Sequence, residues 1–261
     1  MEYKYKVNHE YFDKIDTEYK AYILGFIYAD GSIIQPKGNR QMNLRIAIQE
    51  EDGYILQKFA DEAGGGQIKI SNPPAVQSKG WKKRSIVSIV SDKICNKLIE
   101  LGCKPNKSKI GMNFPKLDNQ LVRHFIRGFL DGDGYIGQKK VRYNYIRKTT
   151  NVRKSSHIQR FQLRMAFTST DKAFLEEIER ILNVSSTYWR FVKRKQNVYT
   201  LWIERVYDFE KVIDYLYDNA TYYLERKFNK TIKSRASGKS EEGLETKDTK
   251  VSLQPPAPIV K

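Results

Sequence analysis

The sequence predicts an α+β protein made of two pseudo-symmetric halves, each with the element order αββαββα. The first observation behind this prediction is a ten-residue pattern that occurs twice, at residues 24–33 and 127–136. The second is a longer stretch after each copy, residues 44–56 and 163–175, which indicates a strand, a turn and an amphipathic helix. A repeat of this length predicts that one structural unit is duplicated within the chain.

The first element of each half is predicted to be a helix. The runs at residues 19–27 and 121–130 are long and apolar enough to form helices. Each run leads to an aspartate of the pattern, Asp30 or Asp133, and the glycine that follows is a typical helix stop. Both carboxylates are therefore expected at helix C-termini, where the helix dipole disfavours an anion and favours a cation.

Two small residues stand four positions apart in each of these helices: Gly25 and Ala29 in the first, Gly128 and Gly132 in the second. This spacing places both small residues on one helix face, so that another backbone can approach closely. We expect the two helices to pack on each other through these faces, with both aspartates side by side at one end. Two adjacent carboxylates repel each other unless a divalent metal lies between or beside them.

The remaining elements of each half are predicted from hydrophobic periodicity. The alternating residues 44–49 and 163–168 indicate strands, and Asp52 and Asp171 are the expected caps of the helices that follow. Each half then continues with a hairpin-like stretch and a second helix: residues 85–90 with 94–101, and residues 198–203 with 209–217. We expect the strands to form antiparallel sheets.

The boundaries of the two halves follow from helix breakers and composition. We predict a first half at residues 1–103, a linker at 104–117, a second half at 118–233 and a disordered tail at 234–261. Two prolines break helix within the linker. The tail is dominated by Ser, Gly, Glu, Lys and Pro, a composition that cannot bury enough apolar surface to fold.

The charge balance indicates a polyanionic partner. Lys and Arg outnumber Asp and Glu by 47 to 30, which gives a net charge of +17. The alternative explanation of this charge is a soluble basic protein with no such partner. Two cysteines, Cys95 and Cys103, suggest neither a disulfide framework nor a zinc site. Because we find no signal peptide and no run of about 18 apolar residues, we expect a cytoplasmic or organelle-matrix-like reducing compartment and no membrane partner.

The twin pattern resembles that of the LAGLIDADG homing endonucleases, in the monomeric form with two motif copies: Leu-Gly-Phe-Ile-Tyr-Ala-Asp-Gly and Arg-Gly-Phe-Leu-Asp-Gly-Asp-Gly. The resemblance covers roughly residues 15–232. It implies that the last acid of each motif, Asp30 or Asp133, binds metal and is catalytic. The earlier acid of the motif is present as Asp131 in the second copy, whereas Tyr28 replaces it in the first; family members vary at this position.

This resemblance implies a site-specific double-strand DNA endonuclease that cleaves a long, mostly asymmetric target by metal-dependent phosphodiester hydrolysis during intron homing. It implies Mg²⁺, with Mn²⁺ as a substitute, held by the two aspartates and by the backbone carbonyls of Ala29 and Gly132. Members of the family often add a Lys or Gln that orders water near each phosphate. The candidates for this peripheral role are Gln49, Lys93 and Arg205.

Side-chain alternation along a strand places Arg45, Ala47 and Gln49 on one face of the first sheet and apolar residues on the other. A twisted antiparallel sheet with such a polar face can lie in the major groove as a DNA-binding saddle. Arg and Lys suit guanine edges, Gln and Asn suit adenine edges, and other lysines hold phosphates. The candidate DNA-binding residues are Gln35, Lys37, Asn39, Arg40, Gln41, Asn43, Arg45, Lys69, Lys82, Lys83, Arg84, Lys139, Lys140, Arg142, Arg147, Lys148, Arg153, Lys154, Arg160, Arg164, Arg190, Lys193, Arg194 and Lys195.

Three functions remain open from the sequence. The first is the endonuclease, a monomer whose partner is double-stranded DNA. The second is a maturase that binds its intron RNA and assists splicing, because LAGLIDADG proteins can serve that role. The third is a cleavage-inactive DNA-binding protein on the same scaffold, which the loss of a motif aspartate would favour; both aspartates are present. The basic stretch 137–160 is expected to be an extended part of the DNA-binding sheet or, equally, a mobile loop that orders on binding.

Overall fold

The computed structural model describes residues 6–38, 40–64, 69–71, 82–149, 152–193 and 196–232. The first half contains α1 (Glu18–Asp30), β1 (Gly31–Ile34), β2 (Asn43–Gln49), the 3₁₀ helix η1 (Glu50–Asp52), α2 (Tyr54–Ala63), β3 (Lys69–Ser71), β4 (Arg84–Val90) and α3 (Asp92–Glu100). After the short α4 (Lys107–Ile110), the second half contains α5 (Asn119–Asp133), β5 (Tyr135–Thr149), β6 (Val152–Ser169), α6 (Lys172–Leu182), β7 (Thr187–Lys193), β8 (Gln196–Ile203) and α7 (Val206–Tyr217). A further helix at residues 225–232 follows α7.

The two halves carry equivalent antiparallel sheets. The strand order is β1-β2-β4-β3 in the first sheet and β5-β6-β8-β7 in the second. Along β2, Leu44, Ile46 and Ile48 are buried while Arg45 and Gln49 are exposed, as the alternation predicts. The predicted fold class, two αββαββα halves with antiparallel sheets, is therefore confirmed.

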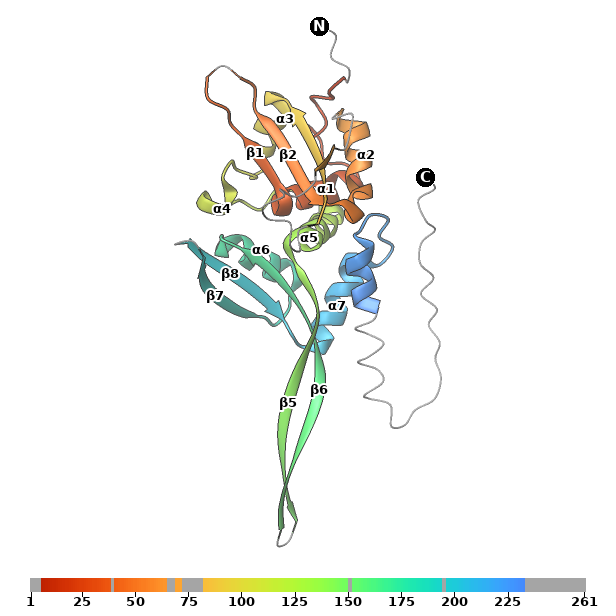
Figure 1. Cartoon of the computed structure of the whole chain (residues 1–261), viewed down its shortest axis with the longest axis vertical. Helices are drawn as coiled ribbons and strands as arrows, with labels where there is room; N and C mark the ends of the chain where they lie inside the picture. The colour runs from red at the N-terminus through yellow and green to blue at the C-terminus, as the bar shows by residue number, and fades with distance from the viewer. Residues whose placement is uncertain are drawn as a thin grey trace.

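The two motif helices pack against each other at the junction of the halves, between the two sheets (Figure 1). A Cβ atom added to Gly25 would lie 1.9 Å from the carbonyl oxygen of Phe125, and one added to Gly128 would lie 1.9 Å from that of Tyr22. Only glycine allows the two backbones to approach this closely. The expected packing through the small-residue faces is confirmed.

Aromatic side chains fill the space beside this helix pair. Tyr28 of α1 meets Phe125 of α5 edge to face with ring centroids 5.0 Å apart. Phe129 of α5 meets Phe174 of α6 in the same way, at 4.9 Å. Each of these four rings is at most 2% exposed, and burial of such a side chain stabilises the fold by about 1.5–3 kcal/mol. The halves thus share one hydrophobic core.

The structure decides between the two alternatives for residues 137–160. β5 and β6 pair continuously from Tyr135↔Ala166 to Thr149↔Val152 and project from the molecule as a two-stranded ribbon, as expected for an extended part of the sheet (Figure 1). β-Branched and aromatic residues in this stretch favour the extended conformation. The region predicted as a linker holds the one-turn helix α4.

The expected cap of α2 is also different. Asp171 caps α6 as predicted, because its carboxylate accepts a hydrogen bond from the Phe174 amide at 3.3 Å. Asp52 does not cap α2, since the extra turn η1 makes Gly53 the capping residue and leaves the Asp52 side chain to pair with Arg226. Cys95 and Cys103 are buried free thiols. Within the described part of the chain, no helix has the length and apolar character needed to cross a membrane.

Candidate active site at the paired helix ends

Asp30 and Asp133 are the last residues of α1 and α5. The glycine after each aspartate has extended backbone angles, and its amide donates to the carbonyl of Ile27 or Leu130. A Cβ at Gly31 would lie 2.6 Å from the Ile27 oxygen, and one at Gly134 would lie 2.5 Å from the Leu130 oxygen. These glycines are therefore needed for close approach to the helix end and not for a left-handed conformation.

The two carboxylates share one electrostatic environment. Both aspartates reach the surface, yet surrounding protein atoms remove enough water to raise the pKa of each carboxyl. The pKa of Asp30 rises to about 6, first because of this desolvation and then because of the negative charge of Asp133. The positive charges of Lys227 and Lys107 oppose the rise at both sites. A cation bound beside the two carboxylates would therefore reduce their repulsion and favour their ionised form.

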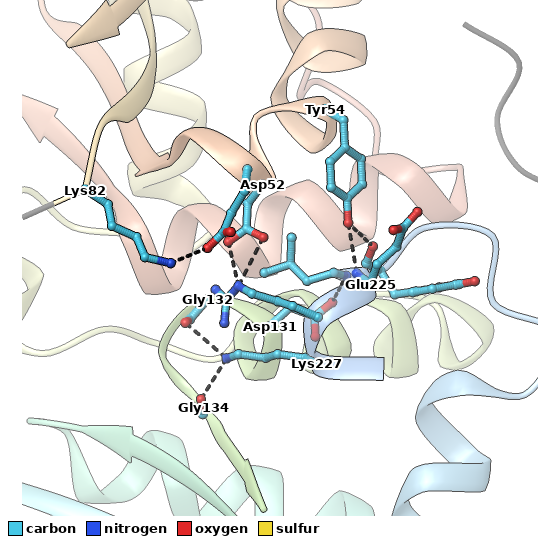
Figure 2. A network of polar contacts seen from close by, with 12 residues as sticks. Asp52, Tyr54, Lys82, Asp131, Gly132, Gly134, Glu225 and Lys227 are labelled. Atoms are coloured by element: carbon cyan, nitrogen blue, oxygen red, sulfur yellow. Dashed lines mark hydrogen bonds and ion pairs between the residues drawn. The ribbon is translucent and has the colours of Figure 1, made fainter. Parts of the chain in front are cut away.

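A lysine binds the carboxyl end of each motif helix, and the sequence analysis did not identify either one. Lys227 Nζ donates to the carbonyls of Leu130 at 2.6 Å, Gly134 at 2.7 Å and Gly132 at 3.2 Å. Figure 2 shows the contacts with Gly132 and Gly134. In the first half, Lys107 Nζ donates to the carbonyls of Ile27, at 3.3 Å, and Gly31. Both amines meet carbonyls of the last helical turn and of the glycine that follows the helix, at the negative end of the helix dipole.

No local pattern marks these lysines in the sequence, and the only signal is their equivalent place in the two halves. Lys107 follows α3 and begins α4, whereas Lys227 follows α7 and lies in the helix at residues 225–232. Burial lowers the pKa of Lys227 to about 8, and the nearby carboxylates limit that effect. A cation was expected at these helix C-termini, and the lysine side chains of the protein itself supply one at each.

The donor set at the helix ends suits Mg²⁺. Among the described residues, no group of three or more His, Cys, Asp or Glu side chains could hold a metal. The available donors are the two carboxylates and the neighbouring carbonyls of Ala29 and Gly132, although the Gly132 oxygen also accepts from Lys227. Mg²⁺ commonly uses one or two carboxylates and completes its shell with water and substrate phosphate. The residues present therefore fit the ion when DNA supplies the phosphates.

Asp131 and Tyr28, at the variable motif position, have structural roles. Asp131 is fully buried and accepts hydrogen bonds from Tyr22 at 3.0 Å, Tyr217 at 2.7 Å and the Leu224 amide at 2.8 Å. Tyr28 donates to the Leu101 carbonyl at 2.5 Å. Each side chain ties its motif helix to the chain that follows α3 in the first half or α7 in the second. The replacement of an acid by Tyr28 thus keeps an equivalent contact.

The peripheral candidates lie in different surroundings. Gln49 is exposed at the end of β2, in register with Arg84. Lys93 forms ion pairs with Glu10 at 2.9 Å and Asp13 at 3.3 Å. Arg205 precedes α7 and donates to Ser185 Oγ at 2.8 Å. Among the described residues, neither Lys93 nor Arg205 forms a hydrogen bond or ion pair with Asp30 or Asp133, and the structure brings Lys107 and Lys227 to the helix ends instead.

The candidate DNA-binding residues are distributed over the outer faces and edges of both sheets. Those with exposed or half-exposed side chains are Gln35, Lys37, Arg40, Gln41, Asn43, Arg45, Lys69, Lys82, Lys83, Arg84, Lys139, Lys140, Arg164, Arg190 and Lys193. Six others lie on the β5–β6 ribbon, of which only the backbone is described: Arg142, Arg147, Lys148, Arg153, Lys154 and Arg160. Asn39, Arg194 and Lys195 lie outside the described residues.

The outer face of the second sheet is aromatic, a feature that the sequence analysis did not predict. Trp202 lies between Tyr135, with ring centroids 5.8 Å apart, and Trp189, at 6.2 Å. The Arg164 guanidinium stacks over Trp202 at 4.1 Å from the ring centroid. Pairing of Trp202 with Ala166 and Thr187 places this group on the face opposite the buried Leu201 and Ile203. The strand register reveals this aromatic group, because it decides which residues of neighbouring strands lie side by side.

The structure is thus a duplicated α+β fold with one exposed carboxylate at each of two packed helix ends, beside two sheets that carry exposed cations. Residues 126–234 match the model of the LAGLIDADG endonuclease family, described as "LAGLIDADG endonuclease". This match lies in the second half of the chain, and together with the solved structures below it confirms the resemblance to the LAGLIDADG homing endonucleases that the motifs indicated.

Solved structures of LAGLIDADG proteins share the fold of most of the chain. The I-LtrWI homing endonuclease bound to target DNA is 14% identical with a TM-score of 0.53, and the match covers 90% of this chain and 92% of that one. I-GzeII in complex with its DNA target is 12% identical with a TM-score of 0.54, and the match covers 89% of this chain and 94% of that one. The meganuclease I-AabMI bound to uncleaved DNA is 14% identical with a TM-score of 0.52, and the match covers 87% of this chain and 92% of that one.

A curated relative is the DNA-directed RNA polymerase subunit Rpo1C of Methanocaldococcus jannaschii. It is 27% identical over 141 residues, which are 53% of this chain. The match spans only 14% of the length of that much longer protein.

The raised pKa of Asp30 predicts how pH changes the stability of the metal-free protein. Between its ordinary pKa of 3.8 and about 6, the folded state holds a proton on Asp30 that the unfolded state has released. The contribution of Asp30 to stability therefore falls as pH rises through this window. We expect the melting temperature of the wild type, relative to Asp30→Asn, to decline from pH 4 to pH 6.5 in EDTA, and Mg²⁺ to offset the decline. Parallel wild-type and variant profiles in EDTA would contradict the assignment.

Proposed function

We propose that this chain is a site-specific double-strand DNA endonuclease that hydrolyses one phosphodiester on each strand with divalent metal, normally Mg²⁺, and for which Mn²⁺ can substitute. The observation that carries the proposal is the pair of exposed carboxylates at adjacent helix ends, each with its own lysine at the helix carboxyl terminus. The metal-binding function of Asp30 and Asp133 is part of this proposal. The proposed target is long and mostly asymmetric, because the two sheets differ in their outer faces.

The chain's own residues would contribute position and charge. Bound Mg²⁺ would supply Lewis-acid stabilisation of the phosphate and a lower pKa for attacking water. Asp30 and Asp133, with the carbonyls of Ala29 and Gly132, would hold the ion. Lys107 and Lys227 keep positive charge beside both carboxylates, which opposes their repulsion and attracts phosphate. Gln49 remains a candidate for ordering water at the sheet end.

DNA would lie along the outer faces of the two sheets, as a saddle on the major groove. Support comes from the net charge of +17 and from the exposed cations on both sheets. The β5–β6 ribbon would extend the second sheet along the duplex. We propose that one chain suffices, since it carries both aspartates, and that the protein acts in a reducing, cytoplasmic or organelle-matrix-like compartment in intron homing.

A maturase that binds intron RNA is the second candidate function. The specific observation in its favour is the aromatic outer face of the second sheet, because exposed aromatic rings on a four-stranded sheet can stack on unpaired bases. A cleavage-inactive DNA-binding protein is less well supported, because both aspartates lie at the helix ends.

The deciding experiment sequences the DNA ends formed when the purified chain is incubated with host genomic DNA and Mg²⁺. We expect paired ends that recur at one long sequence, absent in EDTA and absent with Asp30→Asn or Asp133→Asn. Failure of the wild type to form such ends would reject cleavage of that DNA. A splicing assay with the intron RNA would then test the maturase.

A further inference from the structure

Helix 225–232 belongs to the second half in sequence, but it is bound to the first half. Arg226 Nε donates to both carboxylate oxygens of Asp52, at 3.0 Å to Oδ1 and 2.7 Å to Oδ2. Asp52 is only 3% exposed, so few water molecules can replace this partner. Figure 2 shows Asp52 above the Lys227 side chain. The helix is thus attached to the corner between β2 and α2 of the opposite half.

Tyr54 at the start of α2 strengthens the same attachment. Its hydroxyl donates to the Tyr223 carbonyl at 3.2 Å and accepts from the Glu225 amide at 2.9 Å. Within its own half, the segment is held where Asp131 accepts from the Leu224 amide. Two anchors, one from each half, therefore hold the turn and the helix start that carry Lys227.

The lysine of the first half has the reciprocal arrangement. The segment that contains Lys107 continues to Met112, whose amide donates to Asp171 Oδ2 at 3.0 Å. Asp171 belongs to the second half and stands between β6 and α6, as Asp52 stands between β2 and α2. Each half thus supplies an aspartate that holds the lysine-bearing segment of the other.

We propose that Asp52 and Asp171 are positioning residues that act across the pseudo-two-fold axis, each setting the lysine of the opposite half at its helix end. This inference rests on the proposed endonuclease function. Loss of one contact frees one lysine-bearing segment and leaves the other in place. The consequence is cleavage that becomes unequal between the two DNA strands.

The test compares strand-specific rates on a plasmid that carries the sequence recovered from the wild-type protein's own cleavage ends. Asp52→Asn keeps the shape of the side chain but removes the charge and one acceptor, and the half-exposed Arg226 can still be hydrated. We expect Asp52→Asn to slow one strand about tenfold or more, with the other strand changed by less than about twofold, so that nicked circles accumulate. Lys227→Met should slow the same strand, and Asp171→Asn the other strand.

Glu51→Gln is the matched control. It removes the same charge from the neighbouring residue of η1. Among the described residues, the Glu51 carboxylate forms its ion pair with the exposed Lys82 at 2.7 Å, whereas Arg226 Nε donates to Asp52. We expect this variant to leave the ratio of the two strand rates unchanged. Equal slowing of both strands by Asp52→Asn would overturn the inference, since loss of folding or of DNA binding affects both strands alike.

A second measurement needs no DNA. Acylation of Lys227 by acetic anhydride, followed by peptide mass spectrometry, reports whether the amine remains packed on the three carbonyls. We expect faster modification in Asp52→Asn than in the wild type and Glu51→Gln. Equal reactivity in folded proteins would overturn the inference. If the wild type cuts neither strand while Lys227 reactivity behaves as expected, the proposed function fails and the positioning contact stands.

Discussion

Asp30→Asn and Asp133→Asn are each expected to lower double-strand cleavage by about 10³-fold or more, with DNA binding retained. The amide has the shape of the carboxylate but lacks the charge that holds a divalent ion. Metal stabilisation of the transition state contributes several kcal/mol, and each 1.36 kcal/mol corresponds to about tenfold in rate. The measurement is single-turnover cleavage of the recovered target in Mg²⁺, beside an electrophoretic binding assay in Ca²⁺.

The control for this pair is Asp61→Asn. Asp61 is exposed on α2 and accepts a hydrogen bond from Gln57 at 2.8 Å, so its replacement removes one negative charge far along the chain from the motif. Cleavage by this variant should match the wild type. Loss of DNA binding by a folded Asp30→Asn or Asp133→Asn protein would contradict the metal-holding function assigned to the aspartates.

Gly128→Ala is expected to destabilise the protein by about 3 kcal/mol or more, measured by denaturant unfolding. The added methyl group would lie 1.9 Å from the backbone carbonyl oxygen of Tyr22 and 3.0 Å from the Phe26 amide nitrogen. Backbone atoms cannot move aside by rotamer changes, so the two helices must separate. The variant should lose cleavage along with stability, because the separation also moves the two aspartates apart.

A neighbouring substitution supplies the comparison. A Cβ at Gly132 would lie 2.3 Å from the Cβ of Ala29, which is a side-chain atom that can be deleted. Gly132→Ala should therefore destabilise the protein, and the double variant Ala29→Gly/Gly132→Ala should recover part of the loss. No single side-chain deletion should rescue Gly128→Ala. If Gly128→Ala has the same free energy of unfolding as the wild type, the helices do not pack as described.

The sequence by itself determined the architecture because each element carries its own local signal. The apolar runs before Asp30 and Asp133 predicted the helices, the alternation around Arg45 predicted a half-buried strand, and the repeat predicted two equivalent halves. Small residues four positions apart predicted that the helices meet and bring the aspartates together. These properties depend on neighbours within a few residues, which a sequence displays directly.

Only the tertiary structure decided which side chains join the aspartates. Lys107 and Lys227 reach the helix ends, whereas Lys93 pairs with the N-terminal segment. Asp52, expected to cap a helix, binds Arg226 of the opposite half instead. Such contacts join residues that are far apart in sequence, and their partners are set by how the two halves dock on the α1–α5 pair. A lysine or aspartate at these positions has no local pattern that distinguishes it from a solvated surface residue, because its role depends on the distant backbone that it meets.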